Sequence, residues 1–191
     1  VVLFLAVLCA VMAARQPEFL SMDNIKDVLV QISGIAIAAV GMTLVILTAG
    51  IDLSVGSVLA LSGCAGSLAG LRCAEFGPAW MGVSVGFAAA LATGAICGLL
   101  NGLMVTKIPL TPFIATLGVM GVARGMAYYI SHSSPVQVTA GMRAIALARP
   151  LGIPFPIILM LAIYAIGWLA LRHTRFGRNV YAIGGNEESA R

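Results

Sequence analysis

Long stretches without charged residues are the feature of this sequence that most restricts its fold. Apart from Asp52, residues 28–71 contain no Asp, Glu, Lys or Arg, and the same holds for residues 76–106, 108–123 and 150–171. A helix needs about 20 residues to cross a hydrocarbon layer of about 30 Å. Hydrophobic residues make up 60% of the chain and charged residues only 9%. We therefore expect an all-α, polytopic helical membrane protein.

These windows predict about six transmembrane helices, which we place at residues 1–14, 28–49, 53–71, 79–105, 111–130 and 153–171. The first, VVLFLAVLCAVMAA, could be the apolar region of a signal peptide or a helix cut short at its start. The sequence has no initiating Met and no basic segment before this stretch, which favours the helix. The connection between the fifth and sixth helices is too long for a tight turn, so it could hold a short interfacial helix. The end, NEESAR, is expected to continue into a longer protein.

Residues 50–57, GIDLSVGS, interrupt a stretch that is too long for one transmembrane helix. Gly50 can adopt the positive φ that ends a helix, and Asp52 is a favoured N-cap for the next one. We therefore predict a helix break within residues 50–54. Asp52 either caps a helix at an aqueous turn or lies in a broken-helix region that faces a transport path, as in many transporters.

Polar side chains within or beside the expected spans are the candidates for lining a translocation path. Each also has a structural alternative, since a hydroxyl can bond to its own helix and an Asn can join two helices. Arg124 lies well inside the fifth span, so we expect its charge to face protein, to reach the headgroups or to meet a partner. The candidates are Asp52, Ser54, Ser57, Asn101, Thr111, Thr116 and Arg124.

Several classes of function are disfavoured by the sequence. The net charge of +4 comes from dispersed basic residues with no basic face, which disfavours nucleic-acid binding. The four cysteines lack CxxC spacing and a nearby histidine pair, so we expect no metal site. No catalytic constellation and no GxxxxGK[ST] nucleotide-binding motif occurs, so the chain is not expected to be an enzyme or to hydrolyse ATP itself.

Three ordered stretches resemble the permease subunits of ATP-binding-cassette (ABC) importers for monosaccharides of the ribose/xylose type. They are GMTLVILTAGIDLSVGSVLALSG (41–63), NGLMVTKIPLTPFIATLGVMGVARG (101–125) and TRFGRNVYAIGGNEESAR (174–191). The resemblance implies that residues 1–191 are a single, truncated transmembrane domain of a permease with about ten helices. It also implies a multi-pass location in the bacterial plasma (inner) membrane, with monosaccharide uptake as the function.

The resemblance further implies the partners of the chain and the place where one of them binds. The partners would be an ATPase subunit that binds ATP and Mg²⁺, an extracytoplasmic sugar-binding protein, a second permease copy and membrane lipid. Counts of Lys and Arg do not decide the orientation, but the resemblance places residues 172–191 in the cytoplasm as a segment that couples to the ATPase. Its candidate residues are Arg175, Phe176, Gly177, Arg178, Tyr181, Ala182, Gly184, Asn186 and Glu187.

An ion-coupled secondary transporter of a small polar solute is the alternative interpretation. Such a protein holds its coupling ion within the membrane, and Asp52 together with Arg124 could serve that role. Uptake driven by a proton gradient in liposomes without an ATPase would favour this alternative.

Overall fold

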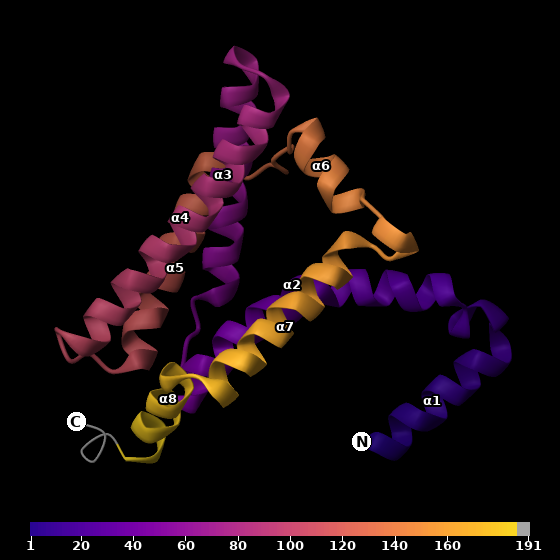
Figure 1. The fold of residues 1–191 in the computed structure, drawn as a ribbon, viewed down its shortest axis with the longest axis horizontal. Coiled ribbons are helices and arrows are strands. Elements are labelled where there is room, and N and C mark those ends of the chain that lie inside the picture. The colour runs from indigo at the N-terminus through magenta and orange to yellow at the C-terminus, as the bar shows by residue number, and fades with distance from the viewer. Residues whose placement is uncertain (187–191) are drawn as a thin grey trace.

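The computed structural model describes residues 1–186, and Figure 1 shows their arrangement. All regular elements in this part of the chain are helices, which confirms the all-α expectation. Five of them, α2, α3, α4, α5 and α7, are long and apolar enough to span a membrane, whereas α1 has 14 residues. The elements are α1 (Val2–Arg15), η1 (Pro17–Leu20), α2 (Met22–Leu47), α3 (Val55–Phe76), α4 (Ala79–Thr106), α5 (Pro112–Ser131), α6 (Ala140–Leu147), η2 (Pro150–Gly152), α7 (Phe155–His173) and α8 (Arg175–Gly185).

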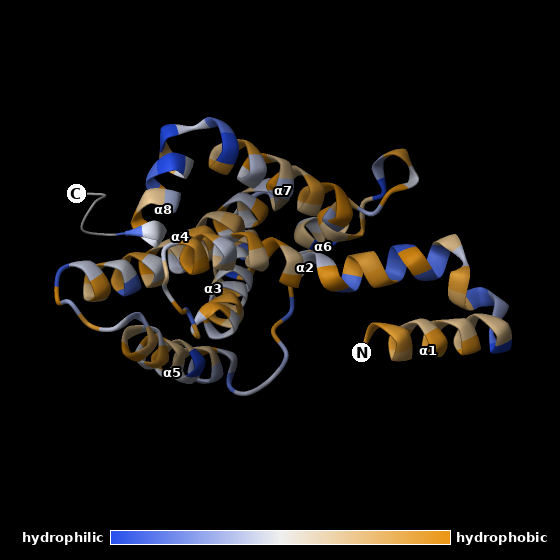
Figure 2. Cartoon of the chain, turned by 90° about the horizontal axis from the view of Figure 1, so that it is seen from below, coloured by the Kyte–Doolittle hydropathy of each residue, from blue (hydrophilic) through white to orange (hydrophobic). Residues whose placement is uncertain are grey.

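The distribution of hydrophobic residues over these helices is that of a membrane protein. Figure 2 shows hydrophobic residues along the long helices and hydrophilic residues gathered in α8 and at several connections. Large apolar side chains such as Leu91 of α4 and Ile35 of α2 are more than 70% exposed in this chain. Helices that are apolar on all sides are stable in lipid or when covered by further helices. The chain is therefore a multi-pass membrane protein.

Helix α2 begins at Met22, so the predicted start of this helix at residue 28 was wrong. The Ser21 hydroxyl oxygen accepts a hydrogen bond from the backbone N–H of Asn24 at 3.2 Å, which caps the first turn. The Asn24 amide group donates to the carbonyl oxygen of Phe19 at 2.7 Å and fixes the preceding corner. Charged residues in the first turns do not prevent a helix when a cap is present. Helix α2 thus extends beyond its uncharged segment.

Four glycines bring the backbones of α3 and α4 into direct contact. They form two GxxxG patterns, Gly66 and Gly70 on α3 and Gly82 and Gly86 on α4. A Cβ on Gly66 would lie 2.7 Å from the carbonyl oxygen of Gly86, and a Cβ on Gly70 would lie 2.8 Å from that of Gly82. Small residues at such positions permit the close helix packing that stabilises membrane bundles. Gly66 and Gly70 of α3 thus admit a close neighbour, which is α4.

Exchanging Gly70 for alanine is expected to destabilise the protein even though alanine favours helices. The new Cβ meets backbone, which cannot move aside, and overpacking of this kind costs about 1–3 kcal/mol. Gly63 lies on the same helix with nothing within 4 Å of a Cβ, so Gly63→Ala should be neutral or stabilising by up to about 1 kcal/mol. Thermal unfolding in detergent measures both variants. Equal melting temperatures for the two variants would contradict the close backbone contact between α3 and α4.

The helices form two groups that meet at one end of the molecule. Helices α3, α4 and α5 pack together, while α2 packs with α7 and α8. Figure 1 shows the groups diverging from the end at which α8 lies, with α6 between them on the opposite side. Helix α6 contacts both α4 and α7, and it confirms the short helix expected between the fifth and sixth spans. The segment from α2 to α3 joins the groups at the end where they meet.

Candidate functional site

The segment from Thr48 to Ser54 is a non-helical break between α2 and α3. Helix α2 ends at Leu47 and α3 begins at Val55, so the break predicted within residues 50–54 is confirmed. The break lies near the ends of the neighbouring helices, because it contacts Asn101 close to the end of α4 and Thr116 close to the start of α5. Polar groups in this segment are therefore close to one side of the membrane-spanning bundle.

The end of α2 is closed by two backbone hydrogen bonds. The N–H of Ala49 donates to the carbonyl oxygen of Ile46, and that of Gly50 to the carbonyl oxygen of Val45, both at 2.9 Å. This is the Schellman pattern, in which the residue after the cap is left-handed. That residue is Ala49, with φ of 58°, so the expectation that Gly50 has positive φ was wrong. Gly50 is instead in close contact, since a Cβ there would lie 3.1 Å from the Val45 carbonyl oxygen.

Replacing Ala49 with glycine is expected to stabilise the protein. An L-residue in the left-handed region costs roughly 1–2 kcal/mol, and glycine avoids that cost. Ala92→Gly, in the exposed middle of α4, is the matched control and should destabilise by up to about 1 kcal/mol. Melting temperatures in detergent should therefore shift in opposite directions. A decrease for both variants would show that the left-handed residue is not strained.

Asp52 holds the backbone of the break by accepting two hydrogen bonds from one residue. Its Oδ1 accepts from the backbone N–H of Ser54 at 2.7 Å and from the Ser54 hydroxyl at 2.6 Å. Ser54 is the N-cap of α3, so the expectation that Asp52 itself is the N-cap was wrong. An Asp side chain readily bonds to the N–H two residues later, and this local turn replaces the capping interaction.

Hydrogen bonds of Asn101 and Thr116 connect the break with α4 and α5. The Asn101 amide group on α4 donates to the Ser54 hydroxyl oxygen at 2.9 Å. The Thr116 hydroxyl oxygen on α5 accepts from the backbone N–H of Leu53 at 3.2 Å and donates to the Pro112 carbonyl oxygen at 2.8 Å. Ser54, Asn101 and Thr116 are 1%, 8% and 4% exposed. These buried bonds make the break a fixed junction of three helices.

A cavity of about 300 Å³ lies beside this junction, and we call it the polar cavity because four polar side chains contribute to its mainly apolar wall. These are Asp52, Ser54, Ser62 and Asn101, and the rest of the lining is Ala38 of α2 together with Val55, Val58, Leu59, Gly94 and Gly98. Within residues 1–186, the buried Ser62 Oγ and Asn101 Oδ1 atoms have no hydrogen-bond partner. Both atoms are enclosed by the chain, whereas Asp52 is only half-buried, so a water molecule or a hydroxyl-bearing solute in this cavity can reach the Asp52 carboxylate.

Ser62 is the site residue that the sequence reasoning missed. It lies eight residues after Ser54, so both are on one face of α3. On α4, Gly94, Gly98 and Asn101 follow at helical spacing and line the same cavity. This spacing was visible in the sequence, but the cavity depends on how α3 and α4 pack.

Ser57 and Arg124 line a different cavity, of about 250 Å³, between α3 and α5. Ser57 is 4% exposed, and its Oγ has no hydrogen-bond partner within the described chain. The Arg124 side chain is exposed and, among residues 1–186, forms no ion pair with Asp52. The structure therefore places Ser57 and Arg124 in a different cavity from the one beside the junction. That Arg124 faces protein stays a prediction for the complete protein.

Thr111 immediately precedes α5 and is exposed, away from the polar cavity.

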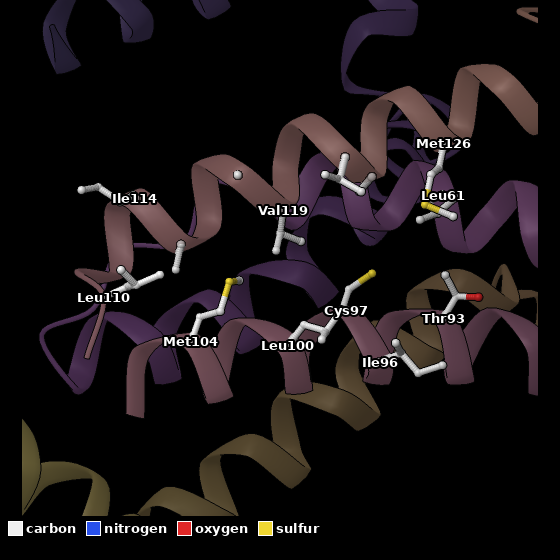
Figure 3. Close-up of a pocket in the computed structure, with 14 residues that line it drawn as sticks. Leu61, Thr93, Ile96, Cys97, Leu100, Met104, Leu110, Ile114, Val119 and Met126 are labelled. Atoms are coloured by element: carbon white, nitrogen blue, oxygen red, sulfur yellow. The ribbon is translucent and has the colours of Figure 1, made fainter. Parts of the chain in front are cut away.

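A third cavity, of about 730 Å³, lies between α4 and α5. Figure 3 shows Cys97 and Leu100 of α4 pointing toward Val119 of α5 across this space. Its lining is almost entirely apolar, with Thr93 the exception. An apolar space of this kind suits hydrocarbon rather than a polar solute.

Helix α8 joins the end of α7 and presents two different faces. The Thr174 hydroxyl oxygen caps it by accepting from the N–H of Gly177 at 3.3 Å. Gly184 and Gly185 belong to its last turn. Val180 and Gly177 are buried, and Glu187 lies outside the described residues. The exposed candidates are Arg175, Phe176, Arg178, Tyr181, Ala182, Gly184 and Asn186.

Comparisons with known proteins relate nearly the whole chain to membrane permeases. Residues 24–191 match the family described as "Branched-chain amino acid transport system / permease component". The ribose import permease protein of Escherichia coli (strain K12) is 42% identical, covering 98% of this chain and 58% of the relative. That of Bacillus subtilis (strain 168) is 39% identical, covering 97% and 56%. The L-arabinose transport system permease protein of Escherichia coli (strain K12) is 39% identical, covering 100% and 55%.

This chain thus spans somewhat more than half the length of these relatives. No solved structure matches the chain.

Proposed function

The chain belongs to the family of branched-chain amino acid transport system permease components, and we propose from this membership that it forms part of the permease of an ABC importer for a monosaccharide. The observation that carries the proposal is its match, along nearly all its length, to ribose and L-arabinose permeases. Within this bacterial family, five spanning helices make it a multi-pass protein of the inner membrane.

The polar cavity beside the helix break supports a role in passing a polyhydroxylated solute. Asp52, Ser62 and Asn101 contribute to its lining, and the half-buried Asp52 carboxylate can accept from passing hydroxyl groups. Hydrogen bonds that replace water are modest in net strength, so a sugar can be held briefly and released. We propose that the path runs past this junction, with Ser54 and Thr116 keeping the break in place.

The energy for transport is proposed to come from a separate ATPase subunit, which would bind ATP and Mg²⁺. Helix α8 is the proposed docking element, because Arg175, Arg178 and Tyr181 project from its exposed face. Charged side chains around an apolar contact fix the register of an interface. A second permease copy and an extracytoplasmic sugar-binding protein complete the proposed assembly. The residues that face the ATPase are then Arg175, Phe176, Arg178, Tyr181, Ala182 and Asn186, with Glu187 following in sequence.

Co-purification tests this proposal. The complete permease, tagged and extracted in mild detergent, is expected to retain an ATP-hydrolysing subunit whose activity rises when the sugar-loaded binding protein is added. A permease that purifies alone and is functional in that form would contradict the proposal and favour the ion-coupled alternative. That alternative has weaker support here, because the relatives are import permeases for sugars and Asp52 and Arg124 line different cavities.

A further inference from the structure

Helix α8 is in backbone contact with the last turn of α2, immediately before the helix break. A Cβ on Gly184 would overlap the carbonyl oxygen of Leu47, the last residue of α2, and would lie 3.7 Å from Thr48 Cα. Only glycine allows such an approach, because any side chain would meet backbone that cannot rotate away. Although Gly184 itself is exposed, the position that a Cβ would take is directed at the end of α2 and not at an external partner.

The other end of α8 is held in the same way by α7. A Cβ on Gly177 would overlap the carbonyl oxygen of Leu171. Gly177, Val180 and Gly184 follow one another at helical spacing, and the first two are buried. One face of α8 is thus fixed against α7 and α2, which leaves Arg175, Arg178 and Tyr181 on the exposed face. Because the contact between Gly184 and Leu47 joins backbone to backbone, a movement of α8 would displace the end of α2 directly, with no flexible side chain between them.

We propose that Gly184 is a positioning residue for transport, through which α8 moves the end of α2 relative to the helix break and the helices α4 and α5 that hold it. The inference rests on the proposed function, since it needs an ATPase that acts on α8. The end of α2 leads within three residues to Gly50, and the break is bound to α4 by Ser54 and to α5 by Leu53. Movement of α2 relative to the group of α3, α4 and α5 would therefore change the polar cavity between them.

Two glycines that are adjacent in sequence provide a matched test. Gly184→Ala inserts a methyl group at the contact, whereas Gly185 has nothing within 4 Å of a Cβ. In the complete permease with its ATPase and binding protein, Gly184→Ala is expected to lower sugar uptake per ATP hydrolysed by about tenfold, because α8 no longer seats on α2. Gly185→Ala should leave the ratio unchanged. An unchanged ratio in an assembled Gly184→Ala complex would overturn the inference.

A distance measurement covers the case in which Gly184→Ala prevents assembly. Spin labels are attached in a cysteine-free complex with native Gly184, at Ile46 with Ile183 in one sample and at Ile46 with Leu103 in another. These three side chains are 62%, 42% and 42% exposed and so accept labels. The α2–α8 distance should stay constant between nucleotide-free and ATP-bound states, while the α2–α4 distance changes.

An α2–α8 distance that changes with nucleotide, or an unchanged α2–α4 distance, would overturn the inference. Failure of the proposed function has a different result, because the unaltered complex would then show no ATP-dependent uptake.

Discussion

Asp52→Ala in the complete permease is expected to reduce sugar uptake by about tenfold or more while expression and assembly with the ATPase persist. The change leaves the N–H and hydroxyl of Ser54 without their acceptor next to the polar cavity. Removing one partner of a buried hydrogen bond costs about 1–3 kcal/mol, so a lower melting temperature should accompany the transport loss. Uptake of radiolabelled sugar and thermal unfolding in detergent measure the two effects.

Two further variants separate the hydrogen bonds of Asp52 from its charge. Asp52→Asn keeps an acceptor oxygen for Ser54, so it should retain most of the uptake if hydrogen bonding is what matters. Asp27→Ala removes an exposed acid at the start of α2 and should have no effect. Normal uptake by Asp52→Ala would contradict the proposed path. A loss with Asp52→Asn as large as with alanine would instead require the charge itself.

Arg178→Glu is expected to remove most of the ATPase from the purified complex. Arg178 lies on the exposed face of α8, where its Nη1 is 3.4 Å from the Thr174 carbonyl oxygen. Reversing a charge that fixes an interface places like charges together, and the affinity should fall by about tenfold or more. The ratio of ATPase to permease after affinity purification measures the change.

The control for this variant is Arg149→Glu, an equally exposed arginine in the connection between α6 and α7. In the proposed orientation that connection faces away from the cytoplasm, so the same charge reversal should leave the ATPase bound. Full retention of the ATPase by Arg178→Glu would place the docking surface elsewhere. Loss of the ATPase from both variants would indicate a general effect on folding.

The sequence predicted the elements of the fold well because membrane helices are determined by length and charge. A hydrophobic stretch that was too long for one span had to contain a break, and GIDLS was the only segment in it with a charge. The details of the break were not predictable in the same way. Whether Asp52 caps the helix or forms a local turn depends on the backbone path, and so does the left-handed conformation of Ala49 rather than Gly50.

The sequence predicted individual residues of the candidate site but not which of them lie together in the structure. Asp52, Ser54, Asn101 and Thr116 were each identified as polar groups in apolar spans, and the structure connects them around the break. That Ser57 and Arg124 line a separate cavity follows from the packing of α3 on α5. The contact of Gly184 with Leu47 likewise depends on tertiary structure, since a sequence does not show what a glycine faces.

Energy-dependent uptake in a defined system tests the central claim most directly. The complete permease is reconstituted into liposomes with its ATPase, and the sugar-binding protein is supplied on the side opposite the ATPase. The account predicts that a labelled monosaccharide accumulates only when Mg-ATP is present on the ATPase side, and that a proton or sodium gradient has no effect. Accumulation driven by an ion gradient in liposomes that contain the permease alone would contradict it.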